Sequence, residues 1–194
     1  MGLNSSWHLK FDKDKNHLLY DYIQANTKSS KIRFDGANLI IIDPCVECLF
    51  EKDGEILKYV NGLYDKFDPD YKRPYKQFEK DGKYGIGCID FGINEGIDKS
   101  IIDFVCVTTN MSILFHRSDS VKNWFLELAC LLEADICYLD KENVGYKIVY
   151  AKGQEIDIEI KEFSQKLYYE DDLERVKVGI MDSVKFALYD NFKL

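Results

Sequence analysis

Long hydrophobic runs are missing from this sequence. No apolar segment approaches the roughly 18 residues that a membrane-spanning helix needs. The first residues, Met1 to His8, contain neither the basic nor the apolar part of a secretory signal. Prolines number only three in 194 residues, and no tract is repetitive or uniformly polar. We therefore expect a folded, cytoplasmic protein that does not bind membranes.

The sequence motifs of common enzymes are also missing. There is no Gly-x-Ser-x-Gly nucleophile motif and no Gly-Lys-Ser/Thr phosphate-binding motif. The glycine-rich segment Gly85–Asp90 lacks the third glycine of a dinucleotide-binding loop. Only three histidines, His8, His17 and His116, are available as general bases. These absences favour a protein that has neither catalytic activity nor a cofactor.

Cysteine pairs that would hold a metal are not found either. Cys45 and Cys48 form a C-x-x-C pair, but the second pair that a structural zinc site needs does not exist. A redox-active pair opens a helix, whereas Pro44 and the following Leu49 and Phe50 favour a continuing strand. We expect reduced, mostly buried thiols and no bound metal.

A basic surface is absent as well. The chain carries a net charge of −8, which argues against binding to nucleic acids and to anionic membranes. The acidity is uneven, because residues 101–194 hold 17 acidic and 11 basic side chains. The C-terminal half is therefore the place to look for an acidic binding surface.

The strongest pattern in the chain predicts a helix from Asp119 to Ala134. Ser118 and Asp119 supply the side chains of a helix start. Six apolar residues follow at the spacing of one buried face: Val121, Trp124, Phe125, Leu128, Leu131 and Leu132. Beside that face, Leu126 and Cys130 interrupt the polar side, so we expect the helix to be covered on more than one side.

Strand patterns surround this helix. Alternating or continuous apolar residues predict strands near residues 7–11, 32–34, 39–42, 84–91, 101–107, 113–115, 136–139, 146–150 and 155–163. The segment Leu39–Ile42 is apolar on both faces, which predicts a central strand. Because the strands follow one another as hairpins, we predict an α+β fold. A single domain would span residues 1–194, with a mainly antiparallel sheet and two or three helices packed on one side.

Two acidic clusters are the candidate binding site. The strand near residues 155–163 alternates isoleucines with Glu155, Asp157 and Glu159, which places the three carboxylates on one face. The second cluster, Glu170, Asp171 and Asp172, precedes a predicted C-terminal helix. A row of like charges on a strand is unfavourable unless cations meet it, either from lysines of the same chain or from a basic partner.

These observations lead to one functional hypothesis and two alternatives. The leading hypothesis is a non-catalytic protein, monomeric or homodimeric, that sequesters a basic partner protein, such as an immunity protein neutralising a toxin. The first alternative is a small hydrolase that uses Cys45, Cys48 or Cys88 with His116. The second is a structural subunit of an assembly that associates through Leu126 and Cys130.

Overall fold

A computed structural model of the chain describes residues 5–28, 31–35, 38–64, 79–141 and 145–161. The chain divides after Ile160 into two units. The predicted C-terminal helix and the acidic cluster Glu170, Asp171 and Asp172 lie outside the described residues. The single-domain organisation of residues 1–194 therefore stays a prediction, while the fold of the first unit can be followed in detail.

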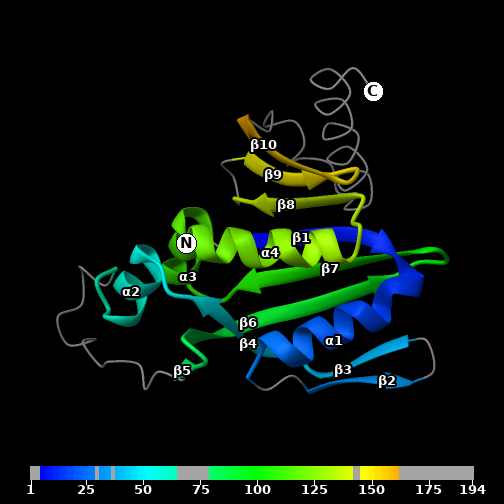
Figure 1. The fold of residues 1–194 in the computed structure, drawn as a ribbon, viewed down its shortest axis with the longest axis horizontal. Helices are drawn as coiled ribbons and strands as arrows, with labels where there is room; N and C mark the ends of the chain where they lie inside the picture. The colour runs from blue at the N-terminus through cyan, green and yellow to red at the C-terminus, as the bar shows by residue number, and fades with distance from the viewer. Residues whose placement is uncertain (1–4, 29–30, 36–37, 65–78, 142–144, 162–194) are drawn as a thin grey trace, which may run out of the picture. The chain divides into compact units, whose positions relative to one another are not determined.

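A mainly antiparallel sheet of eight strands forms the centre of the first unit (Figure 1). Its strands are β1 (Ser6–Asp12), β4 (Cys45–Glu51), β5 (Glu79–Lys80), β6 (Lys83–Glu95), β7 (Lys99–Cys106), β8 (Ile136–Asp140), β9 (Gly145–Ala151) and β10 (Gln154–Lys161). The order across the sheet is β10-β9-β8-β1-β7-β6-β4, and β5 pairs with β6. The first strand of the chain thus lies between two groups of hairpins that come later in the sequence.

Strand β1 forms because its apolar residues alternate with polar ones. Trp7, Leu9 and Phe11 are buried, whereas His8 and Lys10 are only partly buried. This two-residue period directs the apolar side chains to one face of the sheet. β1 pairs antiparallel with β7 on one side and β8 on the other, so it joins both halves of the sheet to one core.

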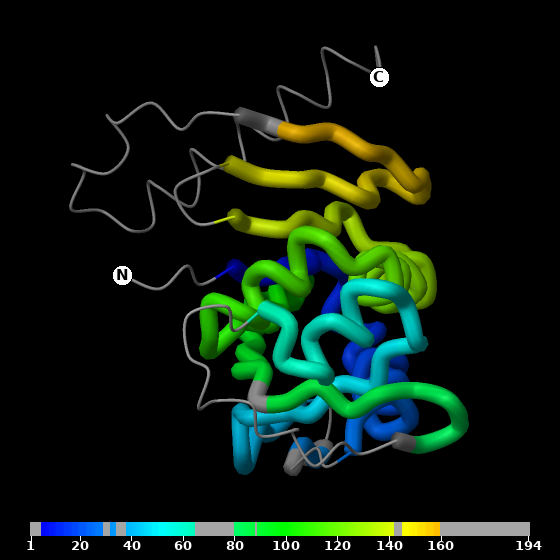
Figure 2. The backbone as a smooth tube through the Cα atoms, turned by 90° about the vertical axis from the view of Figure 1, so that its left-hand side faces the viewer, coloured from blue at the N-terminus to red at the C-terminus, as the bar shows by residue number. Residues whose placement is uncertain are grey.

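The helices are α1 (Asn16–Asn26), α2 (Gly54–Val60), α3 (Thr109–Arg117) and α4 (Asp119–Leu131). Figures 1 and 2 show α1 and α4 on the same face of the sheet, while α2 and α3 lie near one end of α4. None of the helices in the described residues is long and apolar enough to cross a membrane. The predicted α+β fold with a mainly antiparallel sheet is confirmed, and the described residues hold four α-helices where two or three were predicted.

Aromatic side chains join α4 to the central strands. The fully buried Phe125 ring stacks on Trp7 of β1 with 4.8 Å between ring centroids. It meets Phe104 of β7 edge-on at 5.2 Å and Phe115 of α3 at 5.9 Å. Such pairs add to the stability gained from burying the rings. Phe125 therefore fixes the position of α4 over β1 and β7.

One carboxylate caps two helices. Asp53 accepts a hydrogen bond at Oδ1 from the backbone N–H of Ile56, which caps α2. Its Oδ2 accepts from the Ser118 hydroxyl at 2.6 Å and from the Ser120 backbone N–H at 3.0 Å, at the start of α4. Burial raises the pKa of Asp53, but these hydrogen bonds outweigh burial and lower the pKa below 3.8. Asp53 thus ties α2 to the start of α4.

Several details differ from the sequence-based predictions. Leu39–Ile42 belongs to β3 (Asn38–Asp43), which pairs only with β2 (Lys31–Asp35) in a separate two-stranded sheet. It is not a central strand: Leu39 is buried and Ile41 packs against the core, whereas Ile42 is 58% exposed. Residues 113–115 belong to α3 and not to a strand, since Thr108 caps a helix there. Leu131 is 42% exposed because α4 ends at this residue.

We predict that Asp53→Ala lowers the free energy of unfolding by about 2 kcal/mol, since each lost helix cap costs roughly 1 kcal/mol. Because the pKa of Asp53 is lower in the folded state, its stabilisation is complete above the unfolded pKa near 3.8 and is lost as pH falls through the folded value. Urea unfolding across acidic and neutral pH measures both effects.

The matched control is Asp21→Ala, an exposed aspartate in α1, for which we expect a change within about 0.5 kcal/mol. An equal effect of the two substitutions would contradict the double cap. So would a difference between wild type and Asp53→Ala that stays constant as the pH becomes acidic.

Candidate functional site

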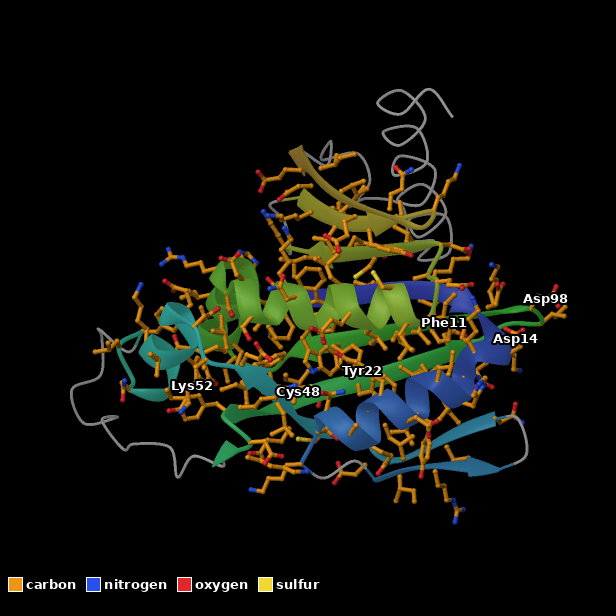
Figure 3. The ribbon with its side chains drawn as sticks, in the orientation of Figure 1. Phe11, Asp14, Tyr22, Cys48, Lys52 and Asp98 are labelled. Carbon is orange, nitrogen blue, oxygen red and sulfur yellow. The ribbon has the colours of Figure 1, made fainter. Side chains whose placement is uncertain are left out.

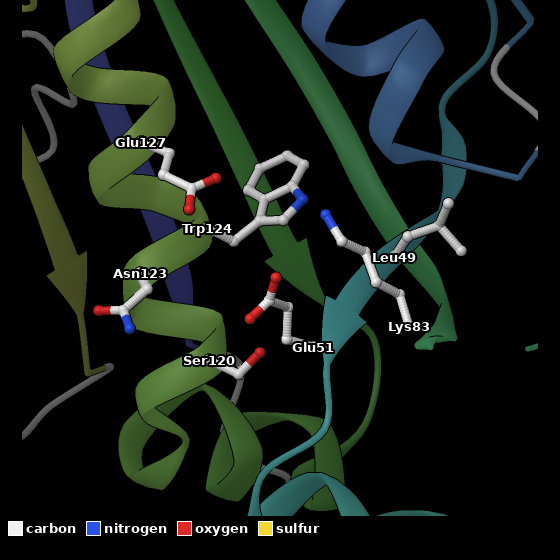
Figure 4. Close-up of a pocket in the computed structure, with 7 residues that line it drawn as sticks. All are labelled: Leu49, Glu51, Lys83, Ser120, Asn123, Trp124 and Glu127. Atoms are coloured by element: carbon white, nitrogen blue, oxygen red, sulfur yellow. The ribbon is translucent and has the colours of Figure 1, made fainter. Parts of the chain in front are cut away.

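A small polar pocket lies between α4 and the β4–β6 edge of the sheet (Figure 4). It encloses about 60 Å³. We call it the Trp124 pocket, and its lining residues are Leu49, Glu51, Lys83, Ser120, Asn123, Trp124 and Glu127. Pockets for metabolites occupy roughly 300–1,000 Å³. The Trp124 pocket is therefore the size of one functional group and not of a whole metabolite.

Helical and strand periodicity bring these residues together. Ser120, Trp124 and Glu127 are spaced at i, i+4 and i+7 on α4, which places them on one side of the helix. Glu51 is the last residue of β4 and is paired with Lys83 of β6. The charged side chains therefore come from three elements that meet only in the folded protein.

Trp124 forms the floor of the pocket. Its side chain is only 4% exposed, and its ring meets the neighbouring Phe125 edge-on at 4.9 Å and three further aromatic rings in the same way. These are Tyr22 at 5.0 Å, Phe104 at 5.5 Å and Phe50 at 5.9 Å between centroids. A ring held on this many sides has little freedom to turn. Trp124 is thus a fixed surface against which a ligand group can pack.

Tyr22 of α1 does not line the pocket but contacts two residues that do, Trp124 and Glu127. It projects from α1 towards α4 (Figure 3), and its hydroxyl lies 3.0 Å from the Trp124 carbonyl and 3.3 Å from Glu127 Oε2. Burial, and then the Glu127 charge, raise the pKa of Tyr22. The phenol therefore stays protonated at neutral pH and remains a hydrogen-bond donor that orients Glu127.

The pocket contains polar groups without partners. Among the described residues, the buried atoms that lack a hydrogen bond are Trp124 Nε1, Ser120 Oγ and Trp7 Nε1. Two of these three belong to residues that line the Trp124 pocket. Buried polar groups are nearly always hydrogen-bonded in folded proteins, so this concentration marks the pocket as a place for a ligand or for water.

The acidic row predicted from the sequence lies on β10. Its carboxylates are exposed: Glu155, Asp157 and Glu159. Lysines of the same chain meet two of them. Asp157 lies 3.3 Å from both Lys122 of α4 and Lys147 of β9, and Glu159 forms an ion pair with Lys141. The row is therefore partly neutralised within the protein, which was one of the two outcomes expected for it.

Those lysines belong to a basic region on the other flank of α4. A second pocket of about 30 Å³ is lined by Trp7, by the basic side chains of Arg117, Lys122 and Lys147, and by His116 and Asp119. Asp157 supplies a carboxylate to two of these lysines. The two flanks of α4 thus differ in charge: basic side chains predominate here, whereas Glu51 and Glu127 line the Trp124 pocket.

The cysteines do not form a catalytic site in the described residues. Cys45 is disulfide-bonded, which corrects the expectation that all thiols are reduced. Cys48 is fully buried in β4, and burial raises its pKa, whereas a catalytic thiol needs a lowered pKa. His116, proposed as the partner of a catalytic cysteine, forms a hydrogen bond with Ser5 Oγ at 2.6 Å. The side chain of Cys88 lies outside the described residues.

Two further expectations can be compared with the structure. Within the described residues, no group of three or more potential ligands could hold a metal ion. Leu126, expected to mark a contact with another subunit, is buried by its own chain, while Cys130 is exposed.

The pocket residues Glu51 and Glu127 were not identified from the sequence. The sequence pattern indicated only that Asn123 and Glu127 project together on the polar side of the helix.

We predict that Cys130 is the one described free cysteine that reacts with iodoacetamide in the folded protein at neutral pH. Cys48, Cys106 and Cys137 are buried and their pKa values are raised by burial, so they should react only after unfolding. Peptide mapping by mass spectrometry measures each site, with Cys130→Ser as the control. Rapid labelling of Cys48 in the folded state would contradict this account and favour a thiol enzyme.

Comparison with known proteins gives no relative. No protein-family model matches the chain, and no curated protein or solved structure is significantly similar to it.

Proposed function

We propose that this protein is a non-catalytic binding protein that captures a basic partner protein. The net charge of −8 favours association with a positively charged surface. The described residues hold neither an activated thiol nor a metal-binding cluster. Binding is therefore the activity that the described side chains support best.

The observation that carries this proposal is the pair Glu51 and Glu127. Both side chains are exposed, and both direct their carboxylates towards Trp124 from opposite sides of the pocket (Figure 4). Neither forms an ion pair with any described residue, in contrast to Asp157 and Glu159 on β10. The two exposed carboxylates, which form no ion pair with described residues, lie beside a buried aromatic ring. This arrangement resembles a protein interface, in which a polar rim surrounds an aromatic core.

An immunity-type role fits these features. A toxin that cleaves nucleic acids needs a positive cleft to bind phosphates. An acidic protein can cover such a cleft, and charge complementarity speeds the encounter. In this proposal the partner meets the Trp124 pocket, the acidic row of β10 is a second contact on the other flank of α4, and the carboxylates of Glu170, Asp171 and Asp172 add to the net negative charge that attracts the partner.

We predict that E51Q/E127Q weakens binding of the partner roughly 10-fold or more, because neutralising interface carboxylates removes attraction to the basic surface. Wild-type and variant proteins would be immobilised side by side in a lysate of the source cells. A stoichiometric basic protein should be retained by wild type, released as salt rises, and lost from the variant. Isothermal titration with the purified partner then gives the ratio of dissociation constants.

Two further variants sharpen the result. Glu133→Gln is the matched control, because Glu133 is exposed just beyond α4 and outside the pocket. It should bind like wild type. The variant E155Q/D157N/E159Q tests the row on β10 without the repulsion that lysines would create beside Lys122, Lys141 and Lys147. Equal binding by wild type and E51Q/E127Q would overturn the assignment of the pocket.

A further inference from the structure

The Trp124 pocket presents hydrogen-bond donors at one end. Trp124 Nε1 is a donor that cannot accept, and it has no partner among the described residues. Figure 4 shows the Lys83 ammonium pointing towards this same nitrogen. The hydrogen bond recorded for Lys83 is a long one, 3.5 Å to Asn26 Oδ1. This end of the pocket therefore calls for an acceptor oxygen.

Away from Trp124 Nε1, the pocket presents acceptors on its two opposite walls. The carboxylates of Glu51 and Glu127 accept hydrogen bonds and donate none. The Ser120 hydroxyl also lines the pocket and lacks a partner in the described part of the chain. Asn123 directs its amide away from the pocket (Figure 4). These walls therefore call for N–H donors.

These requirements exclude groups that can only donate or can only accept hydrogen bonds. An ammonium or guanidinium group has no acceptor for Trp124 Nε1 and would be repelled by Lys83. A carboxylate would satisfy Trp124 and Lys83, but its second oxygen would face Glu51 and Glu127. A carboxamide satisfies both requirements, because its oxygen accepts and its NH₂ group donates. Its size also fits, since about 60 Å³ leaves room for one small functional group.

We propose that the Trp124 pocket binds a carboxamide group, supplied by an asparagine or glutamine side chain of the partner protein. The oxygen accepts from Trp124 Nε1 and Lys83, and the NH₂ group donates to the two glutamates. The source of the carboxamide rests on the proposed function, whereas the chemistry of the pocket does not. Basic residues on either side of the entering amide would meet the acidic rim.

The experiment follows the indole N–H signals of the protein by NMR. The chain has two tryptophans, and Trp7→Phe identifies the signal of Trp124. Propionamide, propylammonium and propionate, which are similar in size, are each added at millimolar concentrations. Propionamide should shift the Trp124 signal downfield and saturate, because the N–H gains an acceptor. The other two probes should leave that signal unchanged.

Matched variants connect the shift to the pocket. Glu127→Ala should weaken propionamide binding several-fold, because one acceptor for the NH₂ group is lost. Glu133→Ala should leave binding unchanged, since Glu133 is also exposed but lies just beyond α4 and does not line the pocket. A pocket that holds only water would give no saturable shift with propionamide. That result, or an equal shift with propionate, would overturn the inference.

Peptides distinguish the two sources of a carboxamide. The capped peptide Lys-Gln-Lys is compared with Lys-Ala-Lys and with propionamide. If a partner side chain is the ligand, Lys-Gln-Lys should bind about 10-fold tighter than propionamide. This gain in affinity should disappear at high salt. Lys-Gln-Lys should also bind more tightly than Lys-Ala-Lys. If propionamide binds and the flanking lysines add nothing, the ligand is a free small amide. The carboxamide chemistry then stands and the proposed capture of a basic protein fails.

Discussion

The packing of α4 on β1 and β7 through aromatic rings is the contact on which the rest of the structure depends. Phe125 meets Trp7 of β1 and Phe104 of β7, and the neighbouring Trp124 meets Phe104 as well. Because β1 joins the β6–β7 hairpin to the β8–β10 strands, this cluster holds both halves of the sheet to one helix. Asp53 fixes the start of the same helix. The flanks of α4, and the pockets beside them, are therefore set by the core.

The two flanks of α4 carry opposite electrostatic character. On one side, Asp157 forms ion pairs with both Lys122 and Lys147. On the other side, Glu51 and Glu127 are exposed beside Trp124, whose indole N–H has no partner in the described residues. Burying a polar group without a partner costs stability. A ligand that forms hydrogen bonds with these groups therefore stabilises the folded protein.

The sequence predicted the fold better than the site, for physical reasons. The helix from Asp119 and the alternating strands follow from local periodicity and capping, so both could be read from neighbouring residues. The prediction that Leu39–Ile42 is a central strand was wrong, because an apolar pattern does not indicate which strand a segment pairs with. The acidic row on β10 is periodic and was found, but its lysine partners come from α4 and β9. Glu51 and Glu127 could not be paired, since 76 positions separate them and only tertiary packing makes them neighbours.

The most direct test of this account is carboxyl footprinting of the protein, alone and bound to its captured partner. A water-soluble carbodiimide with an amine labels exposed carboxylates, and mass spectrometry reports the extent at each one. The account predicts that the partner protects Glu51 and Glu127 strongly, while Glu133 is labelled equally in both states. Unchanged labelling of Glu51 and Glu127, with protection confined to other carboxylates, would contradict the claim that the Trp124 pocket is the binding site.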